Sequence, residues 1–192
     1  LIKIKNINLN SKKKLKRIDQ IDIDLVNNND QISQLNIKRK KNNYSINSKI
    51  FDGTKILDRI LFSKSDGNFF DVFEKLNSKI IINLNTIYIS NEDYLINFKA
   101  DMIVNNNQIK DFILSSQFST KEDLKLSIKT NSNNEKITDL FAGNAKPLVK
   151  KYDFIKGFEG GYLKFDSIEK NKVSNSNLKI FDFKLKEVPA LT

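Results

Sequence analysis

Every second residue from Tyr94 to Val104 is apolar, and the residues between them include Asn97, Lys99 and Asp101. Successive side chains of a β-strand point to opposite faces, so this period of two predicts a strand with one apolar and one polar face. The same alternation recurs along most of the chain. We therefore expect a mainly β fold: a one-sided antiparallel sheet of many strands, with a few short helices.

The chain has 192 residues, which suits one domain or a large piece of one. Its patterns predict a single unit with four parts. Strands fill residues 1–52 and short helices fill residues 53–77, an antiparallel meander follows over residues 78–131, and short helices precede a C-terminal hairpin over residues 136–192.

Helical spacing of apolar residues identifies the expected helices. Two amphipathic helices are predicted near residues 54–61 and 69–76, where apolar residues recur three and four positions apart. The same spacing predicts a helical turn over residues 137–141 and a second helix over residues 145–152. Pro147 fits the first turn of that second helix, where a backbone N–H is not needed.

The first predicted strand changes parity in its middle. Ile2 and Ile4 alternate with lysines, whereas Ile7 and Leu9 continue on the opposite parity. This change predicts a β-bulge near Asn6.

The composition disfavours catalysis. The chain has no Cys and no His, which removes thiolate chemistry, the most frequent general base and the commonest metal ligand. Asp22 and Asp24 share one strand face and are candidates for cation binding or acid–base chemistry. We interpret them instead as the solvated positions of an amphipathic strand. We predict that the protein is not an enzyme and has no cofactor, catalytic residue or metal site.

The net charge of +10 is concentrated near the N-terminus. Residues 1–50 contain twelve Lys and Arg residues against four acidic residues. The basic segment at residues 12–17 is a candidate for binding phosphate groups of nucleic acid or of anionic lipid. No aromatic residue lies within the segment to stack on bases, so nucleic acid is not the expected partner.

The C-terminal fifty residues carry a distinctive series of motifs. Its residues are Leu148, Tyr152, Gly160, Gly161, Tyr162, Leu163, Phe181, Asp182, Phe183, Val188, Pro189, Ala190 and Leu191. The series resembles the C-terminal region of AsmA-like proteins of the YhdP/TamB type, in which a short apolar helix ends near a Tyr and a Gly-Gly-x-Leu element opens a strand. A strand with Asp-Phe follows there, and an Ala-Pro-x-Leu-like element closes the region.

This resemblance implies an elongated, twisted or curled antiparallel sheet that forms an open β-groove with an apolar inner surface. It also implies a bacterial periplasmic protein anchored to the inner membrane. It implies phospholipid transport between the inner and outer membranes, or support of outer-membrane assembly, and it brings no catalytic residues. Gly160, Gly161 and Pro189 belong to its structural motif. The chain begins at Leu1 rather than Met and ends directly after an apolar run, so we expect a fragment of a longer protein whose anchor lies elsewhere.

The expected partner of the apolar face is the acyl chain of a phospholipid. A sheet face packed on protein shows the same alternation, so a non-enzymatic interaction scaffold with a closed β core is the alternative, and nucleic-acid binding through residues 12–17 is a third. The residues predicted to face lipid are Ile80, Ile82, Leu84, Tyr94, Ile96, Phe98, Met102, Leu124, Leu126 and Ile128.

Gly160 and Gly161 have a second expected role. We predict that they form the turn from the 145–152 helix into a strand at Tyr162, and that at least one has a positive φ, which glycine adopts at little cost.

Overall fold

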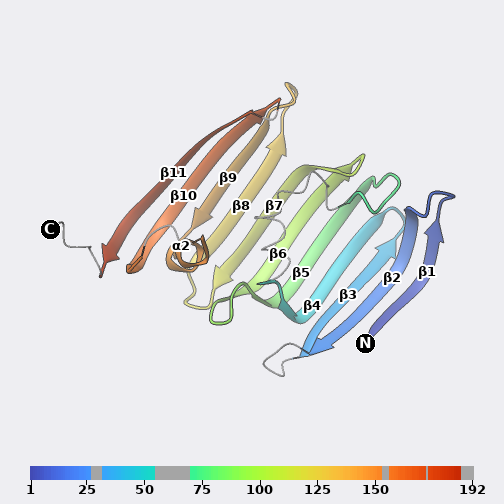
Figure 1. The fold of residues 1–192 in the computed structure, drawn as a ribbon, viewed down its shortest axis with the longest axis horizontal. Coiled ribbons are helices and arrows are strands. Elements are labelled where there is room, and N and C mark those ends of the chain that lie inside the picture. Colours follow the sequence, from blue (N-terminus) through green and yellow to red (C-terminus); the bar gives the residue numbers. More distant parts are fainter. Residues whose placement is uncertain (27–31, 55–69, 153–155, 172, 187–192) are drawn as a thin grey trace.

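A computed structural model describes residues 1–26, 32–54, 70–152, 156–171 and 173–186. Within these residues the chain forms one twisted sheet of eleven strands and a short helix (Figure 1). The elements are β1 (Ile2–Leu9), β2 (Leu15–Val26), β3 (Ile32–Lys40), β4 (Asn43–Asp52), β5 (Ser78–Tyr88), β6 (Tyr94–Asn105), β7 (Gln108–Phe118), β8 (Asp123–Thr130), β9 (Lys136–Ala142), α2 (Lys146–Tyr152), β10 (Phe158–Lys170) and β11 (Val173–Leu185).

The strands lie in sequence order from β1 to β11, and the sheet does not close on itself. Every neighbouring pair is antiparallel except β4 and β5, which run parallel with Tyr44 beside Ile80 and Asp52 beside Tyr88. The predicted mainly β, open sheet is confirmed. The parallel pair is the one departure from antiparallel order, and it requires a crossover because two parallel strands cannot be joined by a hairpin.

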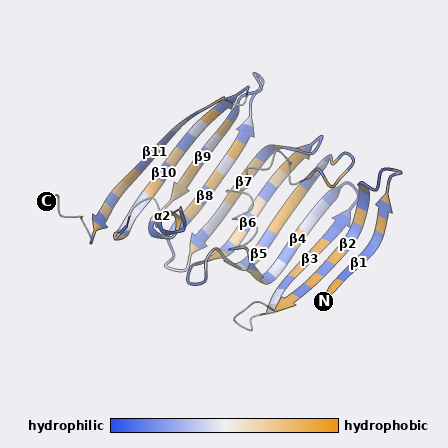
Figure 2. Ribbon diagram, viewed as in Figure 1, coloured by the Kyte–Doolittle hydropathy of each residue, from blue (hydrophilic) through white to orange (hydrophobic). Residues whose placement is uncertain are grey.

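Hydrophobic and hydrophilic residues alternate along most strands (Figure 2), so each strand has one mainly apolar face. We call the face that carries Leu84, Leu114 and Leu124 the inner face, since these side chains are buried in the main hydrophobic cluster. The opposite, outer face carries most of the Lys, Asp and Asn side chains of the strands.

Two elements cover parts of the inner face. The crossover segment, residues 70–76, buries Phe70 and Leu76 against side chains of β4, β5 and β6. Helix α2 and the residue before it bury Val149 and Ala145 completely, in the same cluster as Leu124 and Leu163. Within the described residues the sheet therefore has a partial second layer, made of two short and separate pieces.

The predicted helix near residues 69–76 is wrong for its described part. Residues 70–72 form a turn, Phe73 forms an isolated β-bridge with Leu15, and the rest of the segment is irregular. In that bridge the Leu15 N–H donates to Val72 O at 2.9 Å, and the Glu74 N–H donates to Leu15 O at 2.8 Å. The predicted helix at 54–61 lies outside the described residues except for its first residue. The helix over 145–152 is confirmed as α2, with Pro147 in its first turn.

Residues 137–141, predicted as a helical turn, belong to strand β9. Leu140 and Ala142 pair with β8 and β10 on the inner face, whereas Phe141 lies on the outer face, where its ring is 6.2 Å from that of Tyr162. Apolar residues on both faces hide the period of two, which explains the wrong prediction.

The predicted change of parity near Asn6 is confirmed, but it is not a β-bulge, because the β1–β2 register continues unbroken through Asn6 and shifts only between Asn8 and Leu9. Asn6 has a φ of 54°, and Ile4 pairs with Ile21 while Ile7 pairs with Ile18. Because one left-handed residue separates the two halves of the strand, all four isoleucines lie on the inner face.

Gly160 and Gly161 have φ values of 66° and 73°, so the predicted positive φ is confirmed. Their predicted place is wrong, because both lie inside β10 rather than in the turn before it. They face Asp182 of β11, which also has a positive φ, of 54°. The three residues form an irregular point in the β10–β11 ladder.

Substitution by alanine is expected to distinguish the two glycines. A Cβ at Gly161 would lie 2.5 Å from the Phe181 carbonyl oxygen and 3.0 Å from Phe183 Cβ, whereas at Gly160 the nearest atom is 3.9 Å away. Either alanine should lower the free energy of unfolding by about 1 kcal/mol, because a residue with a Cβ is strained in the left-handed conformation. Gly161→Ala should lower it by roughly 3 kcal/mol in total, because its Cβ also clashes with the backbone of β11. Urea unfolding of both variants measures this difference, and equal losses would contradict it.

Asn107 is expected to hold the crossover segment against the sheet. Its side-chain amide donates to Phe73 O at 3.0 Å, and its side-chain oxygen accepts from Leu76 N–H at 2.5 Å. Asn107→Ala should lower the free energy of unfolding by roughly 2 kcal/mol more than Asn106→Ala. Asn106 is the matched control because it also has a positive φ but contributes only its backbone N–H, to Asn77. Hydrogen exchange of residues 70–76 should accelerate only in Asn107→Ala.

Candidate functional site

Eight of the ten residues predicted to face lipid do lie on the inner face. Register pairs across β5 to β8 place them there, for example Leu84 opposite Phe98 and Leu114 opposite Leu126. They are Ile80, Ile82, Leu84, Phe98, Met102, Leu124, Leu126 and Ile128.

Tyr94 and Ile96 are the two exceptions, and the prediction is wrong for them. Leu95 pairs with Phe118, and both are buried in the inner-face cluster, so the residues on either side of Leu95 point to the outer face. The ladder between β6 and β7 shifts register between Ile96 and Lys99, at Asn97, whose φ is 53°. This bulge reverses the parity of β6, which an unbroken alternation cannot reveal.

The eight inner-face residues are not openly exposed. Ile80, Leu84 and Leu124 are buried, and the other five are half-buried. Several of them pack in the two clusters that include α2 and the crossover segment. The middle of the predicted groove is therefore a protein core for much of its length.

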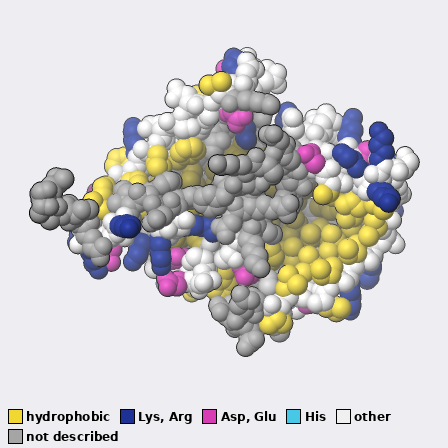
Figure 3. Space-filling model, in the orientation of Figure 1, with side chains coloured by type: hydrophobic (Ala, Val, Ile, Leu, Met, Phe, Trp, Pro, Cys, Tyr) yellow, Lys and Arg dark blue, Asp and Glu magenta, His cyan; other side chains and the backbone are white. Residues whose placement is uncertain are grey.

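The exposed apolar residues of the inner face lie on the two edge strands instead: Leu178 and Leu185 on β11, and a longer row on β1. Ile2, Ile4, Ile7 and Leu9 are 58%, 47%, 49% and 50% exposed, and Leu25 of β2 is exposed as well. We call the four residues of β1 the apolar stripe. In Figure 3 the hydrophobic side chains over the N-terminal strands form a continuous patch on this face.

Part of the apolar stripe could be predicted from the sequence, because the alternation and the parity change at Asn6 place its four residues on one face. The sequence does not tell which strands are covered, since coverage depends on where the crossover and α2 pack. The stripe is therefore absent from the residues predicted to face lipid.

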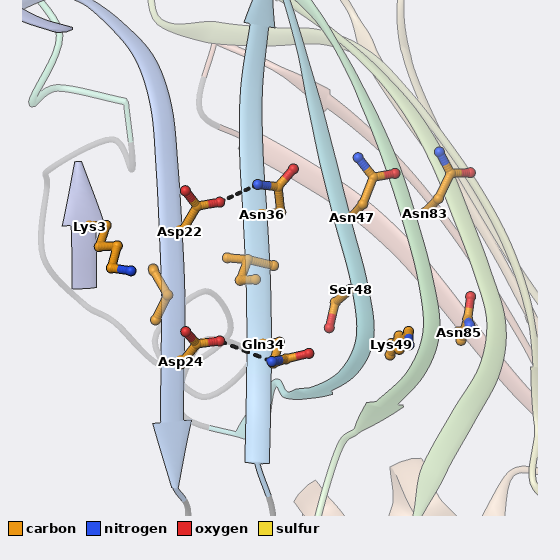
Figure 4. A pocket seen from close by; sticks show the side chains of 12 residues that line it. Lys3, Asp22, Asp24, Gln34, Asn36, Asn47, Ser48, Lys49, Asn83 and Asn85 are labelled. Atoms are coloured by element: carbon orange, nitrogen blue, oxygen red, sulfur yellow. Dashed lines mark hydrogen bonds between the residues drawn. The ribbon is translucent and has the colours of Figure 1, made fainter. Parts of the chain in front are cut away.

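The outer face carries a polar groove of about 580 Å³ across β1 to β5 (Figure 4). Asp22 accepts a hydrogen bond from the Asn36 amide, and Asp24 accepts one from Gln34 at 3.1 Å. Both carboxylates thus occupy the solvated face, consistent with our interpretation of them. Lys3, Asn47, Lys49, Asn83 and Asn85 line the rest of the groove.

The described residues contain no group of three or more acidic, His or Cys side chains arranged to hold a metal ion. Nor does the described part of the chain include a helix with the length and apolarity needed to cross a membrane. Pro189, the third residue of the predicted structural motif, lies outside the described residues.

Helix α2 is joined to the β5–β6 turn by polar contacts. Lys150 Nζ lies 2.5 Å from Glu92 Oε2, and Lys151 Nζ donates to Ile89 O at 3.0 Å. The hydrogen bond from Lys150, together with its positive charge, lowers the pKa of the Glu92 carboxyl below its usual value of 4.5. The same contacts raise the pKa of the Lys150 ammonium.

This pair should make the docking of α2 weakly pH-dependent. Because the folded-state pKa of Glu92 is lowered, the Glu92–Lys150 pair stabilises the docked helix fully above pH 4.5. This stabilisation is lost as the pH falls through the lower, folded-state pKa. An NMR titration should find the Glu92 pKa below 4.5 in the wild type and close to 4.5 in Lys150→Met. An unchanged pKa in this variant would show that the ion pair does not persist in solution.

Comparisons of the chain with protein-family models, with curated proteins and with solved structures found no match. The resemblance to AsmA-like proteins therefore rests on the C-terminal motif residues alone, of which the structure describes those up to Phe183.

Proposed function

We propose that the chain binds phospholipid acyl chains on the exposed part of its inner face, as part of an AsmA-like protein that moves lipid between the inner and outer membranes. The observation that carries this proposal is the apolar stripe: four apolar side chains, each about half exposed, in line on one face of an open sheet. The C-terminal motif supports the family, and with it a periplasmic location and an anchor outside this chain.

The stripe has the physical properties that an acyl chain requires. Removing apolar surface from water contributes about 25 cal/mol per Å², or about 0.8 kcal/mol for each buried CH₂ group. A strand rises about 3.4 Å per residue, so the seven steps from Ile2 to Leu9 span about 24 Å. This length accommodates an extended acyl chain, and no directional bond is needed to hold it.

The burial of the central residues favours the scaffold alternative for that part of the sheet. Leu84, Leu124 and Val149 form an ordinary closed core with α2. The proposal therefore places lipid on β1 and its neighbours, and leaves the middle of the sheet as structural support. Lipid binding involves no bond breaking, so the proposed role is not enzymatic.

Photo-crosslinking tests the proposal on adjacent residues of one strand. A photoreactive side chain at Ile7 should capture phospholipid from cells or vesicles, because it replaces a residue of the apolar stripe. The same group at Asn8 should capture little, because Asn8 pairs with Arg17 on the outer face. Equal capture at the two positions, or capture of a protein alone at Ile7, would favour the scaffold alternative.

A further inference from the structure

Two basic hairpins lie at the same end of the sheet. Because β1 and β3 run in the same direction, the β1–β2 and β3–β4 turns meet at one end of the strands. Figure 3 shows Lys and Arg side chains gathered at this end, beside the hydrophobic patch. We call the cationic residues of both hairpins the basic rim: Lys12, Lys13, Lys14, Lys16, Arg17, Lys38, Arg39, Lys40 and Lys41.

The lysines of the basic rim have no acidic partners among the described residues, whereas its two arginines share Asp19, at 3.0 Å and 3.6 Å. All seven of these lysines are exposed. Elsewhere in the described chain, seven lysines make ion pairs with Asp or Glu: Lys79, Lys125, Lys136, Lys146, Lys150, Lys170 and Lys186.

The nearby crossover segment changes this charge only slightly. It brings Asp71 and Glu74 close to the first hairpin, since Glu74 N–H donates to Leu15 O, and it also brings Lys75. Among the described residues, nine cations of the rim and Lys75 thus lie near three acidic residues at this end, Asp19, Asp71 and Glu74. The excess positive charge of the molecule is concentrated here.

The basic rim is continuous with the apolar stripe. Leu9, the last residue of the stripe, pairs with Leu15 across the first hairpin, and the lysines of that hairpin lie between the two. An apolar strip bordered by lysines matches the interface of an anionic bilayer, where apolar side chains enter the acyl region and ammonium groups meet phosphates.

We propose that this end of the sheet docks on the surface of an anionic phospholipid membrane through the basic rim. The inference rests on the proposed lipid-binding function, because it identifies the surface from which the apolar stripe would take lipid. Nucleic acid is the less suitable partner, since the two hairpins offer no exposed aromatic side chain for stacking.

Vesicle sedimentation with the full chain tests the proposal. The probes are neutral phosphatidylcholine vesicles and vesicles in which about a third of the lipid is phosphatidylglycerol. We expect binding to the anionic vesicles only, and weakening of that binding by high salt. The rim variant changes Lys12, Lys14 and Lys40 to Glu, and it spares Lys13 and Lys41, which have positive φ values.

The rim variant should bind anionic vesicles about a hundredfold more weakly, since each lysine near such a surface contributes about fivefold. The control variant changes Lys99, Lys129 and Lys179 to Glu, three exposed outer-face lysines without a described ion pair, and gives the same net charge. We expect it to retain most of the binding. Equal losses in the two variants, or equal binding of the wild type to neutral vesicles, would overturn the proposal.

Two further measurements separate this inference from the proposed function. If the rim variant keeps its fold by circular dichroism and still captures lipid at Ile7, lipid binding stands whatever the vesicle result. If wild-type Ile7 captures no lipid but the rim still binds anionic vesicles, docking stands and acyl-chain binding fails. A single-stranded oligonucleotide that displaces wild-type protein from the vesicles, and binds the rim variant more weakly, would assign the rim to nucleic acid and overturn the inference.

Discussion

A sheet with one apolar face is stable only if every strand keeps its apolar side chains on that face. A slip of one residue would turn a whole strand's apolar set toward water. Where the sequence alternation changes parity, a left-handed residue inside the strand keeps the apolar side chains on the inner face. These residues are Asn6 in β1, Asn97 in β6, Gly160 and Gly161 in β10, and Asp182 in β11. In each of these strands the inward-facing residues change from one parity to the other around that point. Asn, Asp and Gly tolerate the left-handed conformation, so a local irregularity preserves the long-range pattern on which the fold depends.

The same irregularities also protect the edges of the sheet. β1 and β11 end the sheet, and each contains a residue with positive φ, Asn6 or Asp182. Bulges and lysines on edge strands hinder pairing with another chain, and β1 has both, with Lys3 and Lys5 alternating with its isoleucines. The apolar stripe can therefore remain exposed on an edge strand, with its backbone shape and charge opposing strand addition. An exposed apolar edge that resists strand pairing is better suited to contact a fluid apolar ligand than to pair with a strand of another chain.

The sequence predicts the strands well because alternation is a local signal, as the confirmed meander from β5 to β8 shows. It predicts the change of parity at Asn6 because that change is visible in the isoleucines, although a left-handed residue in continuous register produces it rather than a bulge. It does not reveal the bulge at Asn97, where Leu95 and Ile96 are both apolar and either fits the inner face. Nor does it reveal the parallel β4–β5 pair, which depends on contacts between residues about 36 positions apart, such as Tyr44 and Ile80. The exposed site was missed for the same reason, since exposure of Ile4 or Ile7 depends on where distant segments pack.

The distribution of charge is more informative than its total. At physiological salt, charges act together only within about 8 Å to 10 Å of one another. Some lysines of the outer face pair with neighbouring carboxylates, as with Lys125 and Asp123 at 2.9 Å, and the unpaired ones, such as Lys99 and Lys129, are spread over separate strands. The β1–β4 hairpins differ, because neighbouring strands lie about 4.8 Å apart and their turns bring seven unpaired lysines within a few such spacings. A codon bias toward lysine can raise the net charge of a chain, but it does not explain why seven lysines without ion pairs among the described residues gather at two adjacent turns. The position of this cationic end beside the exposed isoleucines of β1 is the arrangement that an anionic, apolar interface would require.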